Sequence, residues 1–181
     1  MPLARDPLLT AAKALLAFIM GVVAFAAACL LIGAGAVPFL QADILAELSA
    51  EAEQPVSAAL IPAIVALLVA VAALMGLLIA FLQMLWRIVA SVGEGDPFIP
   101  QNATRLNRMA WLVVAGEVLG LAIGALVTQA ARMAAAAGLD ADVDVDIGTG
   151  GSGVLLILVL FILARVFRHG TALRDEVEGT V

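Results

Sequence analysis

One carboxylate stands inside an otherwise apolar segment of the chain, and it has the clearest capacity for chemistry within a membrane. Glu117 lies in VVAGEVLG (113–120), part of a segment apolar enough to cross a bilayer. An acid there costs about 2.5–3.5 kcal/mol on insertion scales, so such groups commonly serve protons, cations or ligands. We therefore take Glu117 as the candidate intramembrane functional residue. The alternative is a protonated side chain that makes one interhelical hydrogen bond.

The surroundings of Glu117 limit what it can do. Helical spacing places it on one face with Gly120 and Gly124, and this face is expected to turn toward a neighbouring helix rather than lipid. The expected partner is a polar group such as Gln83, or a trapped water. A proton relay needs a chain of such groups, and the other apolar segments hold no second intramembrane acid or base.

The acidic segment LDADVDVDI (139–147) raises the question of a cation site. An EF-hand loop needs glycine at its sixth position and glutamate at its twelfth. Counted from Asp142, these positions hold Ile147 and Gly153, so the pattern fails. A count from Asp140 fails in the same way. Alternation of aspartate with apolar residues predicts a solvated strand, with a loose cation site as the alternative.

No set of residues for catalysis stands out. The chain has one cysteine, Cys29, inside an apolar run, and one histidine, His169, near the C-terminus. We find no nucleophile–base pair and no set of metal ligands in the sequence. The expectation is therefore a protein that is not an enzyme, with no cofactor and no bound metal.

The elements that position these residues are expected to be membrane helices. Of the 181 residues, 64% are apolar and 13% are charged, against about 45–50% and about 25% in soluble domains. A net charge of −6 with no basic cluster argues against direct binding of nucleic acid, which needs a basic face for its phosphates. The predicted fold class is all-α: a four-transmembrane-helix bundle.

Four apolar segments approach or exceed the ~20 residues that a bilayer-crossing helix needs. They are residues 14–37, 60–86, 109–129 and 150–167. Because unpaired backbone is not tolerated in hydrocarbon, each is predicted to be helical and to pack within a single membrane domain, residues 1–181. The connecting loops are residues 38–59, 87–108 and 130–149, and the tail is residues 168–181.

Charge asymmetry predicts the orientation. Eight of the nine basic residues lie near the N-terminus, in the 87–108 loop, or in and beside the tail, and only Arg132 lies in the other loops. Since basic residues near span ends favour the cytoplasm, both termini are expected there, with Trp86 and Trp111 at the same interface. The excess of arginine over lysine and the abundant alanine suggest a bacterial source, and hence the inner membrane.

The first outer loop is predicted to contain a short surface helix. In QADILAELSAEAEQP (41–55), Ile44, Leu45 and Leu48 stand at helical spacing with acidic residues opposite. This pattern is typical of a helix with one face on an apolar surface and the other in water.

Small residues at four-residue spacing indicate which helices can approach closely. They are Ala17, Gly21, Ala24 and Ala28 in the first span, Ala72, Gly76 and Ala80 in the second, and Gly116, Gly120 and Gly124 in the third. We expect these three spans to form a tight core and the bulkier fourth span to fit more loosely. A homo-oligomer formed through the glycine face is the alternative, and the lipid bilayer is the expected surrounding in either case.

Two blocks of sequence carry a resemblance to a known family. The first is GDPFIPQNATRLNRMAW (95–111), and the second is LARVFRHGTALRDEVEGTV (163–181), with its VFR.G..L pattern and final TV. They resemble the DUF2975 family of small bacterial four-span membrane proteins, and the resemblance covers essentially the whole chain. The tail departs from the family's usual residues at His169 and at Gly179, where a leucine is more usual.

The resemblance implies a genetic context. Such proteins are often encoded beside a small Cro/C1-type helix-turn-helix regulator, and no catalytic or ligand residues are established for the family. The expected function is a membrane sensor or regulatory partner that binds such a regulator at its cytoplasmic face. The alternative is a small transporter, or a ligand- or proton-responsive bundle, centred on Glu117.

The first block is expected to leave the membrane in a sharp turn and to return as a helix. Pro97 fixes its own φ and keeps Asp96 extended, and a helix is predicted from about Pro100. On that helix, Asn102 and Arg105 are predicted to share a face with either Arg108 or Met109.

The tail is expected to form an amphipathic helix that covers the first block. Its apolar stripe is Leu163, Val166, Gly170, Leu173 and Val177. The candidate docking residues on the two blocks are Asp96, Pro97, Phe98, Asn102, Arg105, Arg108, Arg168 and Leu173. The alternatives are arginines that only anchor the topology and a loop that is only a turn locked by prolines.

Overall fold

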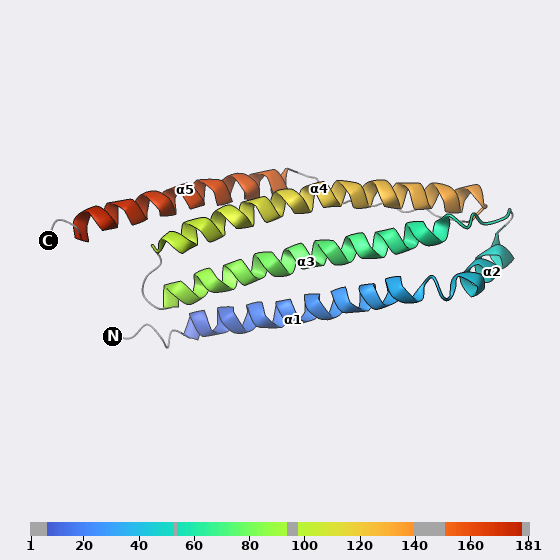
Figure 1. Ribbon diagram of the computed structural model, residues 1–181, viewed down its shortest axis with the longest axis horizontal. Helices are drawn as coiled ribbons and strands as arrows, with labels where there is room; N and C mark the ends of the chain where they lie inside the picture. Colours follow the sequence, from blue (N-terminus) through green and yellow to red (C-terminus); the bar gives the residue numbers. More distant parts are fainter. Residues whose placement is uncertain (1–6, 53, 94–97, 140–150, 179–181) are drawn as a thin grey trace. The chain divides into compact units, whose positions relative to one another are not determined.

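The structure is a computed structural model that describes residues 7–52, 54–93, 98–139 and 151–178, with side chains described as far as Ala172. These residues form five α-helices and no strand (Figure 1). The helices are α1 (Pro7–Ala36), α2 (Gln41–Glu51), α3 (Leu60–Gly93), α4 (Pro100–Ala136) and α5 (Ser152–Glu178). The predicted all-α class is therefore confirmed.

Four of these helices are long and apolar enough to cross a membrane: α1, α3, α4 and the Ser152–Ala172 part of α5. Many of their large apolar side chains lie on the outside. Phe25 of α1 is 73% exposed and Leu155 of α5 is 64% exposed. Such continuous apolar surface is unfavourable in water and suits lipid. The prediction of a multi-pass membrane protein with four spans is thus supported by both length and exposure.

The membrane helices extend beyond the apolar segments predicted for them. α3 continues past Trp86 to Gly93, and α4 begins at Pro100, well before the predicted span at residue 109. The bilayer limits only the apolar part of a helix, while backbone hydrogen bonds carry the helix on into polar sequence. Pro100 suits the first turn, where no intrahelical N–H donor is needed, so the predicted start of this helix is confirmed.

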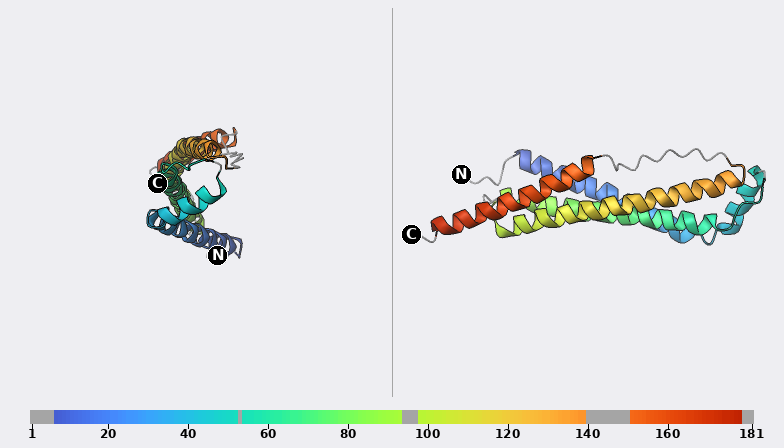
Figure 2. Two further views of the ribbon diagram at one scale, coloured as in Figure 1. Left: turned by 90° about the vertical axis from the view of Figure 1, so that its right-hand side faces the viewer. Right: turned by 90° about the horizontal axis from the view of Figure 1, so that it is seen from above.

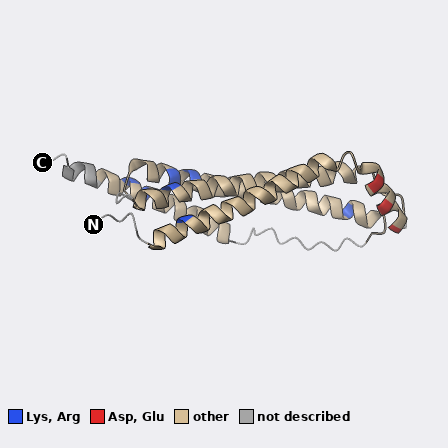
Figure 3. Cartoon of the chain, turned by 90° about the horizontal axis from the view of Figure 1, so that it is seen from below, with Lys and Arg blue, Asp and Glu red and all other residues tan. Residues whose placement is uncertain are grey.

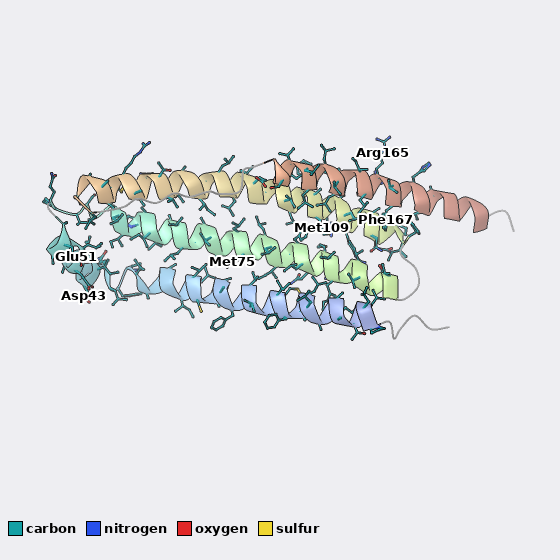
Figure 4. The ribbon with its side chains drawn as sticks, turned by 180° about the vertical axis from the view of Figure 1, so that it is seen from behind. Asp43, Glu51, Met75, Met109, Arg165 and Phe167 are labelled. Carbon is teal, nitrogen blue, oxygen red and sulfur yellow. The ribbon has the colours of Figure 1, made fainter. Side chains whose placement is uncertain are left out.

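The short helix predicted in the first outer loop is confirmed as α2. Its apolar residues Ile44, Leu45 and Leu48 are half-buried, whereas Asp43 and Glu51 are exposed. Figure 4 shows these two carboxylates on the helix. The spacing of apolar residues therefore identified both the helix and its inward face.

Backbone contacts divide the chain into two compact units. Unit 1 contains Met1–Val23, Leu77–Gly116 and Gly150–Val181, and unit 2 contains Ala24–Gly76 and Glu117–Thr149. Within unit 1, α5 lies along the first half of α4 in the views of Figures 1 and 2. Both blocks of sequence that resemble the family belong to unit 1.

The buried core of unit 1 joins α4 to α5. Its residues are Leu106, Met109 and Ala110 of α4 with Leu160 and Ala164 of α5. Side chains of α3 that include Phe81 and Met84 pack against this cluster. The prediction that the fourth span fits loosely is therefore wrong. Bulky side chains of α5 meet those of α4, so dispersion contacts hold the two helices without a stripe of small residues.

The small-residue face predicted for α1 does not pack against another described helix. Ala17, Gly21, Ala24 and Ala28 are all exposed, and nothing lies within 4 Å of the position that a Cβ on Gly21 would take. This part of the predicted tight core is wrong, because small residues permit close approach without requiring it.

In unit 2 the predicted small residues are partly inward. Ala72 of α3 is only 6% exposed, and Gly120 of α4 is buried. Gly76, by contrast, is exposed.

Candidate functional site

The loop before α4 is pinned to α5 by an aromatic contact. The ring centroids of Phe98 and Phe167 are 5.2 Å apart, with the planes tilted by 37°. A Cβ on Gly170 would lie 3.0 Å from Cδ1 of Phe98, so the absence of a side chain at this position makes room for the ring. The loop and the tail, predicted to meet, are thus in contact through these three residues.

A hydroxyl group adds a polar link between the same two segments. Oγ1 of Thr171 lies 2.8 Å from the carbonyl oxygen of Phe167 and 3.2 Å from that of Phe98, and it donates toward both. The first contact is the usual bond of a helical threonine to the preceding turn. The second crosses to the loop. We refer to Phe98, Phe167, Gly170 and Thr171 as the loop–tail junction.

A buried amide joins the end of α3 to the start of α4. Asn102 is fully buried, and its Nδ2 donates to Oγ of Ser91 at 2.7 Å. Ser91 in turn donates to the carbonyl oxygen of Ile88 at 2.8 Å. Nη1 of Arg105 donates to Oδ1 of Asn102 at 2.8 Å and to the carbonyl oxygen of Arg87 at 3.1 Å. We refer to Ser91, Asn102 and Arg105 as the amide network.

The amide network changes the roles predicted for its members. Asn102 and Arg105 do share a face, and Met109, at 2% exposed, shares it with them rather than the exposed Arg108. That face is turned inward, which corrects the predicted place of Asn102 on an exposed docking surface. A buried side-chain amide is stable only with hydrogen-bonding partners, and here the partners come from two helices.

The remaining docking candidates are distributed as follows. Phe98 is 43% exposed, so part of its ring is accessible although it contacts α5. Arg108 and Arg168 are exposed. Asp96, Pro97 and the side chain of Leu173 lie outside the described residues.

The buried face of α5 differs from the predicted stripe. Leu163 and Val166 are 39% and 54% exposed. The positions turned inward are Leu160, Ala164, Phe167 and Thr171. Leu163 and Val166 are thus each followed by an inward residue, a shift of one position, whereas Gly170 of the predicted stripe does contact the loop. Because α5 is apolar on nearly every side, hydropathy does not distinguish the packed face from a face toward lipid.

Two polar residues of the site were not predicted. Ser91 and Thr171 are 5% and 8% exposed, and both bond to a carbonyl of their own helix as well as reaching a neighbouring segment. The sequence shows a serine near the end of one helix and a threonine near the end of another. It does not show which group each hydroxyl would bond, so the contacts could not be predicted from it.

Glu117 lies in the unit 2 part of α4. It is half-buried, with Gly120 buried three residues later, so its predicted face is directed inward. Among the described residues no hydrogen bond or ion pair to Glu117 is formed. Gln83, the partner expected from the sequence, is exposed and belongs to unit 1.

No metal centre is found in the part of the chain that the structure describes. No three histidine, cysteine, aspartate or glutamate residues there are placed to hold an ion. From Asp140 onward, the acidic segment with the predicted strand lies outside the described residues. Cys29 is an exposed free thiol.

Comparison with known proteins supports the family resemblance. A family model described as "Protein of unknown function (DUF2975)" matches residues 14–181, which include the loop–tail junction and the amide network. No curated protein and no solved structure gives a significant match. The family match reaches from the first span to the last residue, and the chain therefore belongs to the DUF2975 family.

Proposed function

We propose that this protein is a non-enzymatic regulator of the bacterial inner membrane, which holds a small helix-turn-helix transcription regulator at its cytoplasmic face. The observation that carries the proposal is the loop–tail junction. Segments 73 positions apart in sequence, Phe98 and Thr171, are joined into one surface by an aromatic contact and a hydrogen bond. This surface would sense a change in the membrane-spanning helices, because both segments continue directly from them.

The charge of unit 1 supports a cytoplasmic position for this surface. The lysines and arginines whose side chains are described, other than Arg132, belong to unit 1, and they are Lys13, Arg87, Arg105, Arg108, Arg165 and Arg168. On α2 in unit 2 the charged side chains are acidic (Figure 3). Basic residues next to a span are retained in the cytoplasm, so unit 1 would carry both termini and the loop before α4 on that side.

The chemistry of the surface favours a protein partner. Arg108 and Arg168 are exposed, and part of the Phe98 ring in the same unit is accessible. A surface that combines basic and aromatic groups complements an acidic and apolar patch on a protein. The DNA-reading face of a regulator is itself basic, so the regulator would dock through another face. The identity of the partner class rests on the neighbouring regulator genes that the family resemblance implies.

Co-purification tests the proposal. The full-length protein, produced in membranes together with the regulator encoded beside it, should retain that regulator in the membrane fraction. Arg108→Glu should release it, because Arg108 is exposed and its charge would be reversed without disturbing the amide network. Arg132→Glu is the matched control, an exposed arginine of α4 in unit 2. A regulator that stays soluble beside the unaltered protein contradicts the proposal.

A second candidate function rests on Glu117. A half-buried carboxylate of a spanning helix, with no partner among the described residues, is suited to a ligand or a proton. The chain would then act as a small transporter or a ligand-responsive bundle. Glu117→Gln keeps the shape and removes the acid, so it should abolish uptake or the response to pH. An unchanged response would exclude this function.

A further inference from the structure

An open groove lies along α5 of unit 1, beside α4. Its volume is about 890 Å³, and its lining includes Asn107 of α4 with Phe161, Ile162, Arg165, Arg168 and His169 of α5. A site for a molecule of several dozen atoms has about 300–1,000 Å³, so the groove is large enough for a lipid headgroup and the first part of its chains. Neither the loop–tail junction nor the amide network contributes to this lining.

The groove is divided into an apolar and a basic part. Phe161 and Ile162 belong to the apolar run of the span, whereas Arg165, Arg168 and His169 follow at its end. Figure 4 shows the side chain of Arg165 reaching outward from α5, while Phe167 turns toward the neighbouring helices. A molecule in the groove would therefore meet apolar groups at one end and hydrogen-bond donors at the other.

An aromatic pair indicates the depth of the groove in the membrane. Trp111 packs edge-on against Phe161, with ring centroids 5.9 Å apart and planes at 82°, and it remains 61% exposed. Exposed tryptophan is enriched where hydrocarbon meets headgroups. Phe161 would thus lie at the edge of the hydrocarbon, and Arg165 and Arg168, about one and two turns further on, would lie among the headgroups.

Among the side chains that the structure describes, the basic residues of the groove have no counter-charge. Arg165 and Arg168 are both exposed, and no ion pair to either occurs in the described part of the chain. The described residues that line the groove include no carboxylate. Like charges three residues apart on one helix repel each other, so an anion shared between them would be favourable.

We propose that this groove is a binding site for an anionic phospholipid. The two guanidinium groups and the imidazole N–H donate to the phosphodiester, for which arginine is geometrically suited. The acyl chains follow Phe161 and Ile162 into the bilayer. Basic pockets between spanning helices are the usual form of such headgroup sites. An anionic lipid fits better than a zwitterionic one because the described lining offers guanidinium groups to the phosphate and no carboxylate to a headgroup ammonium.

Lipid titration of the full-length protein in a nonionic detergent tests this site. The probes are phosphatidylglycerol, phosphatidylethanolamine with the same acyl chains, and inorganic phosphate. Native mass spectrometry should show a phosphatidylglycerol adduct that persists at activation energies which remove phosphatidylethanolamine. Phosphatidylglycerol should also raise the Tm, and inorganic phosphate at the same concentration should not.

Charge-neutralising variants assign the effect to the groove. Arg165→Gln and Arg168→Gln should each weaken phosphatidylglycerol binding about fivefold, the contribution of one arginine near an anionic headgroup. Arg87→Gln and Arg132→Gln, exposed arginines outside the lining that are not docking candidates, are the matched controls and should bind as the unaltered protein does. Arg165 is not one of the docking candidates, so its variant separates this site from the proposed binding of a regulator.

Three results would overturn the proposal. If the groove variants bind phosphatidylglycerol as tightly as the controls do, the lipid does not bind in this groove. If phosphatidylethanolamine gives the same adduct stability and the same rise in Tm, the site is not selective for an anionic lipid. An equal response to inorganic phosphate would show that a soluble anion is the occupant. The Tm of each variant without lipid verifies that folding is unchanged, and Ile162→Ser gives a second variant that removes part of the apolar lining without altering charge.

Discussion

The two compact units place their polar side chains differently. In unit 1, the buried polar groups Ser91, Asn102 and Thr171 all have hydrogen-bonding partners, and they join segments that are distant in sequence. In unit 2, the half-buried Glu117 has no partner among the described residues, and the carboxylates of α2 are exposed. Polar groups thus stabilise the packing of unit 1, whereas in unit 2 the half-buried carboxylate makes no hydrogen bond or ion pair to a described residue.

The comparison also separates two kinds of candidate site. In unit 1 the proposed docking surface consists of exposed groups such as Arg108 and Arg168. In unit 2 the candidate is the half-buried carboxylate itself. Substitutions in unit 1 should therefore change stability through the buried groups, and substitutions in unit 2 should change activity with little effect on stability.

The largest expected effect is that of Asn102→Ala. The substitution leaves Ser91 and Arg105 without an amide partner and creates a small cavity, so the free energy of unfolding should fall by about 2–4 kcal/mol. Denaturant titration in detergent micelles measures this loss. Gln101→Ala, at the exposed neighbouring position, should change the stability by less than about 0.5 kcal/mol. Equal losses in the two variants would mean that the amide network does not hold unit 1 together.

Gly170→Leu should destabilise the loop–tail junction by about 1–3 kcal/mol, because even a Cβ would crowd the Phe98 ring. The midpoint of thermal unfolding reports the change. In the Phe98→Ala background the same substitution should cost less, since the ring is gone. Gly21→Leu is the control at an open helical position, where leucine should be favourable by up to about 1 kcal/mol. Identical effects with and without the Phe98 ring would contradict the contact.

Thr171→Val keeps the shape of the side chain and removes its hydroxyl. The expected loss is about 0.5–1.5 kcal/mol, the contribution of one hydrogen bond to the loop. Thr128→Val is a matched control, because the hydroxyl of Thr128 donates to the carbonyl of Gly124 in its own helix and is exposed. If both variants lose the same free energy of unfolding, the hydrogen bond from Thr171 to the Phe98 carbonyl does not contribute to stability.

The smallest effect on stability is expected for Glu117→Gln in unit 2. With no described partner to lose, the free energy of unfolding should change by less than about 0.5 kcal/mol. Chemical unfolding of the purified variant, at a pH where the unaltered protein is folded, measures the change. If Glu117→Gln lowers the free energy of unfolding as much as Asn102→Ala does, Glu117 stabilises the fold through polar contacts. The two units would then not differ in the role of their inward polar groups.

The sequence was sufficient to predict the elements but not all of their packing. Hydropathy identified the four spans, Pro100 marked the start of α4, and the spacing of Ile44, Leu45 and Leu48 identified α2. These features depend on local physical chemistry: the thickness of a bilayer, the geometry of proline, and the period of a helix.

The packed faces could not be predicted in the same way. On α5 the inward Ala164 and the exposed Leu163 are both apolar, because in a membrane the surface toward lipid is as apolar as the surface toward another helix. On α1 the small residues at Gly21 and Ala24 permit an approach that no described helix makes. For Asn102, the sequence indicated a polar residue near a span end. Only the three-dimensional fold shows the partners that allow it to be buried.

The central claim is that the exposed surface beside the loop–tail junction binds a regulator. The most direct test places a photo-activated crosslinking residue at Arg108 in the full-length protein, in cells that produce the regulator encoded beside it. The account predicts a covalent complex with that regulator, and none from the same residue at Arg132 in unit 2. Equal crosslinking at the two positions, or none at Arg108 while the regulator co-purifies with the protein, would contradict it.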